Sequence, residues 1–161
     1  MLSLHVLAAI IAVGPVAVAA SMFPKVLRRA HEGAEPAASP RLLHRVCRVY
    51  AGVGIAVPVF GFATASNMKV LGSAWLITAI GLTAVAAGVL VVWILPAQQA
   101  ALEELAGDAG DGDGDGDSGG SGRVGVAKVA ARLGAATGIF NLLWAAVTVL
   151  MIVRPGSTTG A

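Results

Sequence analysis

Residues 76–95, "LITAIGLTAVAAGVLVVWIL", decide the fold of this chain. The stretch contains no charged side chain, and a helix needs about 20 consecutive apolar residues to cross the hydrocarbon layer of a bilayer. The rest of the chain is similarly apolar, because 57% of its 161 residues are hydrophobic and only 12% are charged. Soluble domains usually carry about a quarter charged residues. The stretch therefore predicts a membrane-spanning helix.

Four apolar segments of this kind follow one another along the chain. The predicted spans cover about residues 2–23, 42–65, 70–95 and 127–153. Pro24, Pro96 and Pro155 follow three of them, and Ser39-Pro40 predicts the start of the second as an N-cap followed by a first-turn proline. We expect one membrane domain over residues 1–161, an all-α integral membrane four-helix transmembrane bundle.

The first span also has to be compared with a cleavable signal peptide. The residues "AVAAS" at 17–21 resemble a small-residue cleavage site. No lysine or arginine precedes the apolar run, however, and basic residues follow it instead. This order favours a retained helix with its N-terminus outside.

Basic residues lie mostly in two of the connections, and this bias predicts the orientation. Only Lys69 and Arg154 fall on the opposite side. The split predicts that both longer loops are cytoplasmic and that the N- and C-termini are outside. The same residues, with a net charge of +2, indicate membrane orientation and no nucleic-acid partner. The residues that determine this topology are Lys25, Arg28, Arg29, Arg41, Arg45, Arg48, Arg123, Lys128 and Arg132.

Residues 107–122, "GDAGDGDGDGDSGGSG", predict a flexible cytoplasmic linker. Asp111, Asp113 and Asp115 fit positions 1, 3 and 5 of a calcium-binding loop, but Gly122 then stands where the bidentate glutamate is needed. We expect a tether and no specific calcium site.

Small residues four apart predict close helix packing, because lipid tails are as apolar as leucine and association needs near backbone contact. Gly134 and Gly138 form a GxxxG pair in the fourth span. They predict packing within the bundle or a homodimer. The expected partners are the lipid bilayer and a second copy or a larger membrane complex.

Two prolines and one asparagine fall inside the spans. Pro15 and Pro58 each remove an amide and free the carbonyl four residues earlier. Asn141 lies near the centre of the fourth span, where an amide is costly unless it is paired. We predict that its amide caps one of the freed carbonyls and forms a polar core, or that it contacts a substrate.

Few residues in the chain are suited to chemistry. His5, Met68 and Met151 lie near span ends on the same predicted side, and imidazole with thioether suits copper(I) or a haem. The spans contain no charged residue in their cores, and no hydrolase, nucleotide-binding or zinc-protease motif is present. We expect a protein that is not an enzyme.

The stretch "LHVLAAIIAVGPVAVAASMFP", residues 4–24, resembles a bacterial family of four-span membrane proteins, domain of unknown function 2269. The similarity consists of His5, Gly14-Pro15 and the basic loop that follows. That family is distantly similar to the CopD-like copper-resistance membrane proteins, whose first span also begins with Leu-His. The resemblance implies a four-span fold, with His5 as the one ligand that carries over.

The sequence predicts a small integral membrane protein of the bacterial plasma membrane, with a structural or accessory role. One alternative is a metal- or haem-handling protein that uses His5. A second alternative is a small-solute permease whose path passes Asn141.

Overall fold

The computed structural model describes residues 2–108 and 119–156, which are helical over most of their length and contain no β-strand. The elements are the helices α1 (Leu2–His31), α2 (Ala38–Val53), α3 (Ala56–Asn67) and α4 (Ala74–Gly88), the π-helical segment η1 (Val89–Ile94), and the helices α5 (Leu95–Asp108) and α6 (Gly119–Val153). The expected all-α class is confirmed.

Four of these helical stretches are long and apolar enough to cross a membrane, namely Ser3–His31, Ala38–Asn67, Ala74–Gly107 and Gly125–Val153. Their outward faces are apolar too: Leu142, Val92 and Ile152 are each more than 70% exposed. Soluble monomers rarely leave apolar surface of this extent open to water. The four long apolar helices predicted from the charge-free runs are confirmed.

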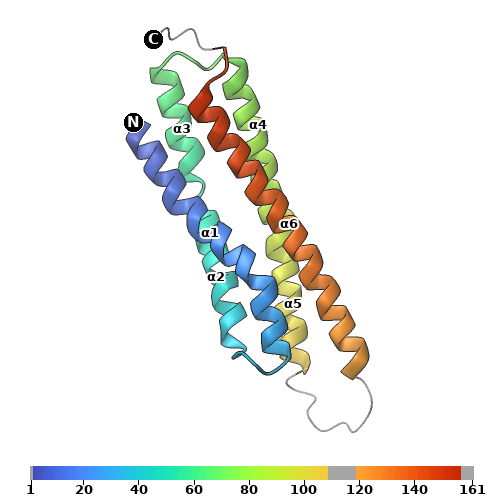
Figure 1. Cartoon of the computed structure of the whole chain (residues 1–161). Helices are drawn as coiled ribbons and strands as arrows, with labels where there is room; N and C mark the ends of the chain where they lie inside the picture. Colours follow the sequence, from blue (N-terminus) through green and yellow to red (C-terminus); the bar gives the residue numbers. More distant parts are fainter. Residues whose placement is uncertain (1, 109–118, 157–161) are drawn as a thin grey trace.

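The helices run side by side in an elongated bundle (Figure 1). The start of α1, the α3–α4 connection and the end of α6 lie at one end, which we call the terminal end. The α1–α2 connection, the end of α5 and the start of α6 lie at the other, which we call the loop end. Most basic residues belong to the loop end, whereas Lys69 and Arg154 belong to the terminal end.

Of the three prolines predicted to close spans, only Pro155 follows a helix end, since α6 ends at Val153. Pro24 lies inside α1, because Phe23 and Leu27 on either side are buried in the same hydrophobic cluster and hold the helix together. Pro96 lies inside the continuous helical stretch Ala74–Gly107, directly after the π-helical segment η1. Ser39 is not an N-cap, since α2 begins one residue earlier at Ala38.

The predicted linker, residues 107–122, is helical at both ends. Gly107 and Asp108 belong to α5, and residues 119–122 belong to α6. The aspartate-rich part, residues 109–118, lies outside the described residues, and it includes Asp111, Asp113 and Asp115, which were compared with a calcium-binding loop.

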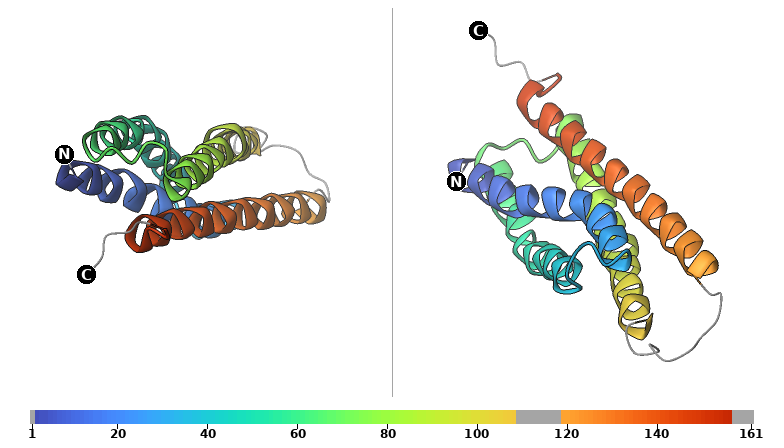
Figure 2. Two further views of the ribbon diagram at one scale, coloured as in Figure 1. Left: turned by 90° about the horizontal axis from the view of Figure 1, so that it is seen from above. Right: turned by 60° about the horizontal axis from the view of Figure 1, so that its bottom comes forward.

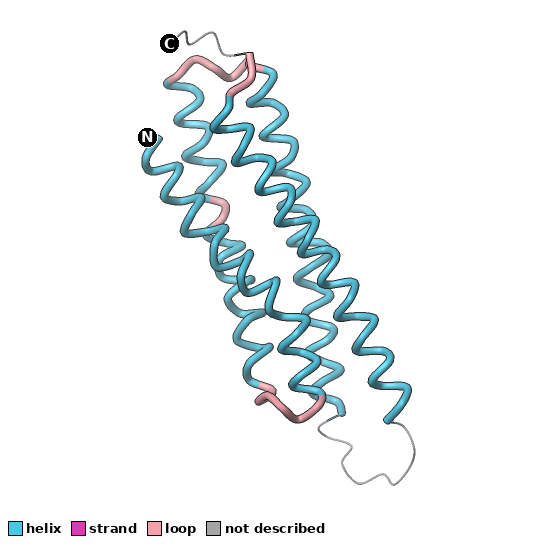
Figure 3. The backbone as a smooth tube through the Cα atoms, viewed as in Figure 1, coloured by secondary structure: helices cyan, strands magenta, loops and turns pink. Residues whose placement is uncertain are grey.

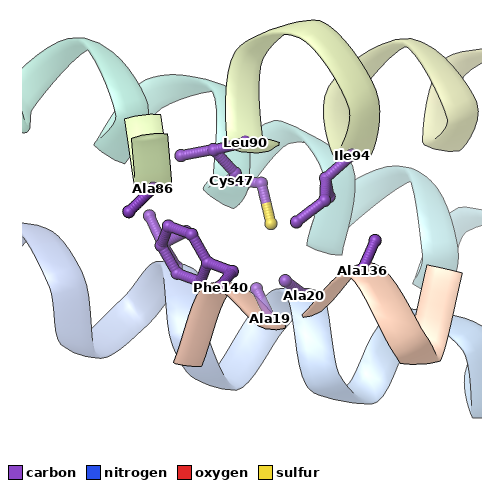
Figure 4. Packing of buried hydrophobic residues seen from close by; sticks show 9 residues of the cluster. Ala19, Ala20, Cys47, Ala86, Leu90, Ile94, Ala136 and Phe140 are labelled. Atoms are coloured by element: carbon purple, nitrogen blue, oxygen red, sulfur yellow. The ribbon is translucent and has the colours of Figure 1, made fainter. Parts of the chain in front are cut away.

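The central core is built mainly from alanine. Ala19 and Ala20 of α1, Ala86 of α4 and Ala136 of α6 surround Phe140, which is 2% exposed. Figure 4 shows these side chains converging with Cys47, Leu90 and Ile94 from the facing helices. Small side chains allow the backbones to approach closely, as expected for helices that associate in lipid.

The GxxxG pair takes no part in this packing. Gly134 and Gly138 are exposed, and a Cβ added at either position would meet nothing within 4 Å. The prediction that this face packs within the bundle is wrong, because α6 is rotated so that Ala136, Thr137 and Phe140 face inward instead.

Candidate functional site

The second span is broken into two helices near its middle, as Figure 3 shows. Pro58 has no amide to bond the carbonyl of Gly54, so the amide of Val57 bonds it at 3.1 Å. The amide of Ile55 likewise donates to Gly52 rather than to Ala51, at 3.2 Å. The carbonyls of Ala51 and Val53 thereby lose their helical partners. The predicted kink at Pro58 is thus a short interruption of the hydrogen-bond pattern over residues 54–55, which keep helical dihedral angles.

Gly54 keeps right-handed helical backbone angles, φ −57° and ψ −21°, so the chain continues from α2 into α3 through a tight turn. A Cβ at Gly54 would lie 3.1 Å from the carbonyl oxygen of Ala51 and 3.3 Å from that of Tyr50. Both distances are shorter than ordinary van der Waals contact. The missing amide of Pro58 is the cause of the interruption.

The third span is irregular at a point that faces the break. Residues Val89–Ile94 form a π-helix, in which the amide of Leu95 bonds the carbonyl of Leu90 five residues earlier. Single π-turns inside α-helices occur frequently at functional sites. The segment also leads directly into Pro96, so the wider turn comes just before the residue that cannot donate a hydrogen bond.

A cavity of about 360 Å³ lies between these two irregular segments. The break contributes residues 50–52, 54, 55, 57 and 58, and η1 contributes Leu90 and Val91. Residues 12, 13 and 16, next to Pro15 in α1, close a further side, and Phe140 and Trp144 of α6 complete the wall. Ligand pockets in proteins typically measure about 300–1,000 Å³.

The cavity opens on the outer surface of the bundle. Ile55 and Val91 line it and are each more than half exposed. Figure 2 shows the cause: α3 lies beside α1 and stands apart from α6 in both views. The apolar wall of the cavity is therefore open to the outside of the bundle.

The walls of the cavity are apolar and carry no charge. Among its lining residues only Tyr50, Thr83 and Trp144 have a polar side-chain atom. The Thr83 hydroxyl already donates to the carbonyl of Ala79 at 2.8 Å. Trp144 Nε1 is buried without a partner in the described part of the chain. Tyr50 makes no side-chain hydrogen bond to a described residue, so its hydroxyl is the one that remains available.

Asn141 lies outside this cavity and does not cap a carbonyl. Its Nδ2 donates to the hydroxyl oxygen of Ser21 at 3.1 Å, and that hydroxyl donates to the carbonyl of Ala17 at 2.6 Å. The predicted contact with a carbonyl freed by Pro15 or Pro58 is wrong, because the amide bonds Ser21 instead. Asn141 does link α6 to α1, but its Oδ1 is buried without a partner among the described residues.

His5 holds α1 against α3. Its Nδ1 lies 3.0 Å from the carbonyl oxygen of Val57, which can only accept, so Nδ1 carries the proton. The ring fits because residue 61 is glycine: a Cβ there would lie 3.0 Å from His5 Cε1 and 3.3 Å from Nδ1. This pairing of His5 with Gly61 has no sequence signal beyond a glycine in an apolar run.

The predicted metal-ligand set is not assembled. His5 lies beside Gly61, and Met68 follows seven residues later, a rise of about 10 Å along the chain. Met151 packs instead on the cluster around Trp75. No group of three His, Cys, Asp or Glu side chains that could hold a metal ion occurs within residues 2–108 and 119–156.

A buried polar contact that the sequence did not indicate joins α2 to α5. Gln98 is 1% exposed, and its Oε1 accepts a hydrogen bond from His44 Nδ1 at 3.1 Å. Its Nε2 lies 3.9 Å from the sulfur of Cys47, which is fully buried. The only available signal was a glutamine one turn after the apolar run of the third span.

No protein-family model matches the chain, and neither a curated protein nor a solved structure matches it. Function is therefore inferred from the geometry of the bundle and its cavity.

Proposed function

We propose that this chain is a non-catalytic accessory protein of the bacterial plasma membrane that holds a neutral, lipid-soluble molecule in the cavity at the helix break. The observation that carries the proposal is the composition of that cavity. Its wall is built by two irregular segments, carries no charge and opens toward the lipid.

A neutral ligand is favoured because burying an unpaired charge in an apolar wall is costly. One oxygen function on the ligand is favoured because Tyr50 lines the cavity with an unused hydroxyl, which can donate to a carbonyl or accept from a hydroxyl. The rest of the wall suits a hydrocarbon or isoprenoid chain. The class is thus a long, neutral molecule of the bilayer with a carbonyl or hydroxyl group.

The break itself supports binding rather than a purely structural role. Interrupted helices at membrane depth are tolerated where the freed backbone groups line a cavity or are covered by protein. Ala51 lines the cavity, and its carbonyl has lost its helical partner. An unbroken α-helix would give a more stable span, so the interruption is expected to serve the cavity.

The membrane and the orientation are proposed from the sequence. Arginine outnumbers lysine eight to three and alanine, valine and glycine are abundant, a composition typical of GC-rich bacteria. The excess of basic residues at the loop end favours a cytoplasmic loop end. The bacterial plasma membrane would also supply the hydrocarbon-soluble ligand.

Tryptophan fluorescence can test the proposal with a defined probe, a bromine-labelled fatty alcohol added to the purified chain in lipid nanodiscs. Trp144 lines the cavity, Trp93 is 62% exposed on the outer surface, and Trp75 is buried in a separate cluster with Ala65 and Leu76. We expect saturable quenching in the Trp93→Phe variant, which retains Trp144. The double variant Trp93→Phe, Trp144→Phe retains only Trp75 and should show only quenching that rises linearly with the probe.

Tyr50→Phe adds a second readout, because it removes one oxygen and leaves the shape of the cavity unchanged. Loss of a single hydrogen bond corresponds to about 0.5–1.5 kcal/mol, or roughly a two- to tenfold weaker half-saturation. Linear quenching in both tryptophan variants would contradict the proposal.

A further inference from the structure

A second hollow, of about 240 Å³, lies between α5 and α6 toward the loop end. It is separate from the central cavity, since the two share no lining residue. Its floor is formed by alanines and Leu133, and its rim carries Trp93, Glu104 and Arg132. It is the only one of the two that has charged residues in its wall.

The two charges face one hollow without neutralising each other. Neither Glu104 nor Arg132 forms an ion pair with a described residue. The Glu104 carboxylate reaches α6 near Gly125, with Oε1 3.9 Å from where a Cβ at that glycine would lie. Arg132 lies seven residues further along α6, which is a rise of about 10 Å. A group placed between them can contact both.

The three rim residues stand in a fixed order along the bundle axis. Trp93 lies toward the apolar centre, and Arg132 directly precedes the charge-free run 133–153 of α6. Glu104 lies furthest toward the loop end, near the end of α5. Arg132 is therefore at the depth where the hydrocarbon layer gives way to lipid headgroups.

We propose that this hollow binds a phospholipid with a primary ammonium headgroup, of the phosphatidylethanolamine type. An acyl chain lies on the alanine floor between Ala97 and Ala136, the phosphate contacts Arg132, and the ammonium group contacts Glu104. In such a lipid the phosphate is nearer the hydrocarbon and the ammonium is further out, in the same order as the arginine and the glutamate. A primary ammonium also donates hydrogen bonds to a carboxylate, which a trimethylated ammonium cannot do.

The test is a competition among three lipids of identical acyl chains, with ethanolamine, choline or glycerol headgroups. Each is added in equal amount to the unmodified, delipidated chain in detergent, and bound lipid is counted by native mass spectrometry. We expect the ethanolamine lipid to exceed the other two by about fivefold, which corresponds to about 1 kcal/mol.

Two variants and one control assign the contacts. Glu104→Gln should make the ethanolamine and choline lipids bind equally, and Arg132→Gln should weaken all three. Lys128→Gln is the control, because Lys128 is exposed one turn from Arg132 on α6 and does not line the hollow.

Equal binding of the three lipids by the unmodified chain would overturn the proposal, and this result needs no variant to fold. A preference for the ethanolamine lipid that survives in Glu104→Gln would overturn it as well. So would a Lys128→Gln variant that loses lipid as strongly as Arg132→Gln, since that outcome would indicate general attraction to basic residues.

Discussion

The contact between His5 and Gly61 predicts how two glycines of the same chain should differ on substitution by alanine. Gly138 is exposed and its added Cβ would meet nothing within 4 Å. Alanine is favoured over glycine inside a helix by about 1 kcal/mol. Gly138→Ala should therefore raise the free energy of unfolding by up to about 1 kcal/mol.

Gly61→Ala should raise the free energy of unfolding much less than Gly138→Ala does. The new Cβ would lie 3.0 Å from His5 Cε1, whereas ordinary contact begins at 3.4 Å, so the ring must retreat by a few tenths of an ångström. The hydrogen bond from Nδ1 to the Val57 carbonyl is already 3.0 Å long and weakens as the ring moves. Its loss costs about 0.5–1.5 kcal/mol, which cancels the helix-propensity gain.

A double-mutant cycle isolates this effect. Unfolding in mixed micelles with increasing denaturing detergent is measured for the unmodified chain, His5→Ala, Gly61→Ala and the double variant. Gly61→Ala should be near neutral alone and should stabilise the His5→Ala protein by about 1 kcal/mol. Equal effects in both backgrounds, within the roughly 0.3–0.5 kcal/mol of ordinary additivity, would refute the proposed contact.

Two further substitutions test the polar contacts between helices. Gln98→Ala should lower the free energy of unfolding by about 2–3 kcal/mol, because it leaves a buried space and unpairs His44, whereas Gln99→Ala at the exposed neighbouring position should change it by less than about 0.5 kcal/mol. Asn141→Leu should change it by less than about 1 kcal/mol, since the lost bond to Ser21 is offset by removal of an unpartnered buried oxygen. Both are measured by the same detergent titration, and a large loss of stability in Asn141→Leu would show that the amide is an essential polar link.

The number of spans could be predicted from the sequence because the bilayer imposes a simple rule. A charge-free run of sufficient length, such as residues 76–95, has few alternatives to crossing the membrane. The ends of the helices could not be predicted as well, because Pro24 is tolerated when buried neighbours on both sides hold the helix in place. The sequence shows where the proline is, but tertiary packing determines whether the helix ends there.

The cavity could not be predicted from single residues. Pro58 indicated a disturbance in the second span, but the π-helical segment 89–94, "VLVVWI", looks like any apolar helix. The prediction that Gly134 and Gly138 pack within the bundle was wrong for a related reason. A small-residue pair packs only if its face of the helix turns inward, and the rotation of α6 depends on the whole bundle.

The most direct test of the proposed function is to fill the central cavity and measure what remains bound. Ala87 lines the cavity and is exposed, so Ala87→Leu adds bulk to the cavity without disturbing the buried core. Ala84→Leu is the matched control, because Ala84 is exposed on the same helix and does not line the cavity.

Each protein is purified from its membrane, and its neutral lipids are extracted and counted per chain by mass spectrometry. We predict one neutral molecule with a carbonyl or hydroxyl group in near-equal ratio to the unmodified chain and to Ala84→Leu, and its loss from Ala87→Leu. The same lipid content in all three proteins would contradict the account.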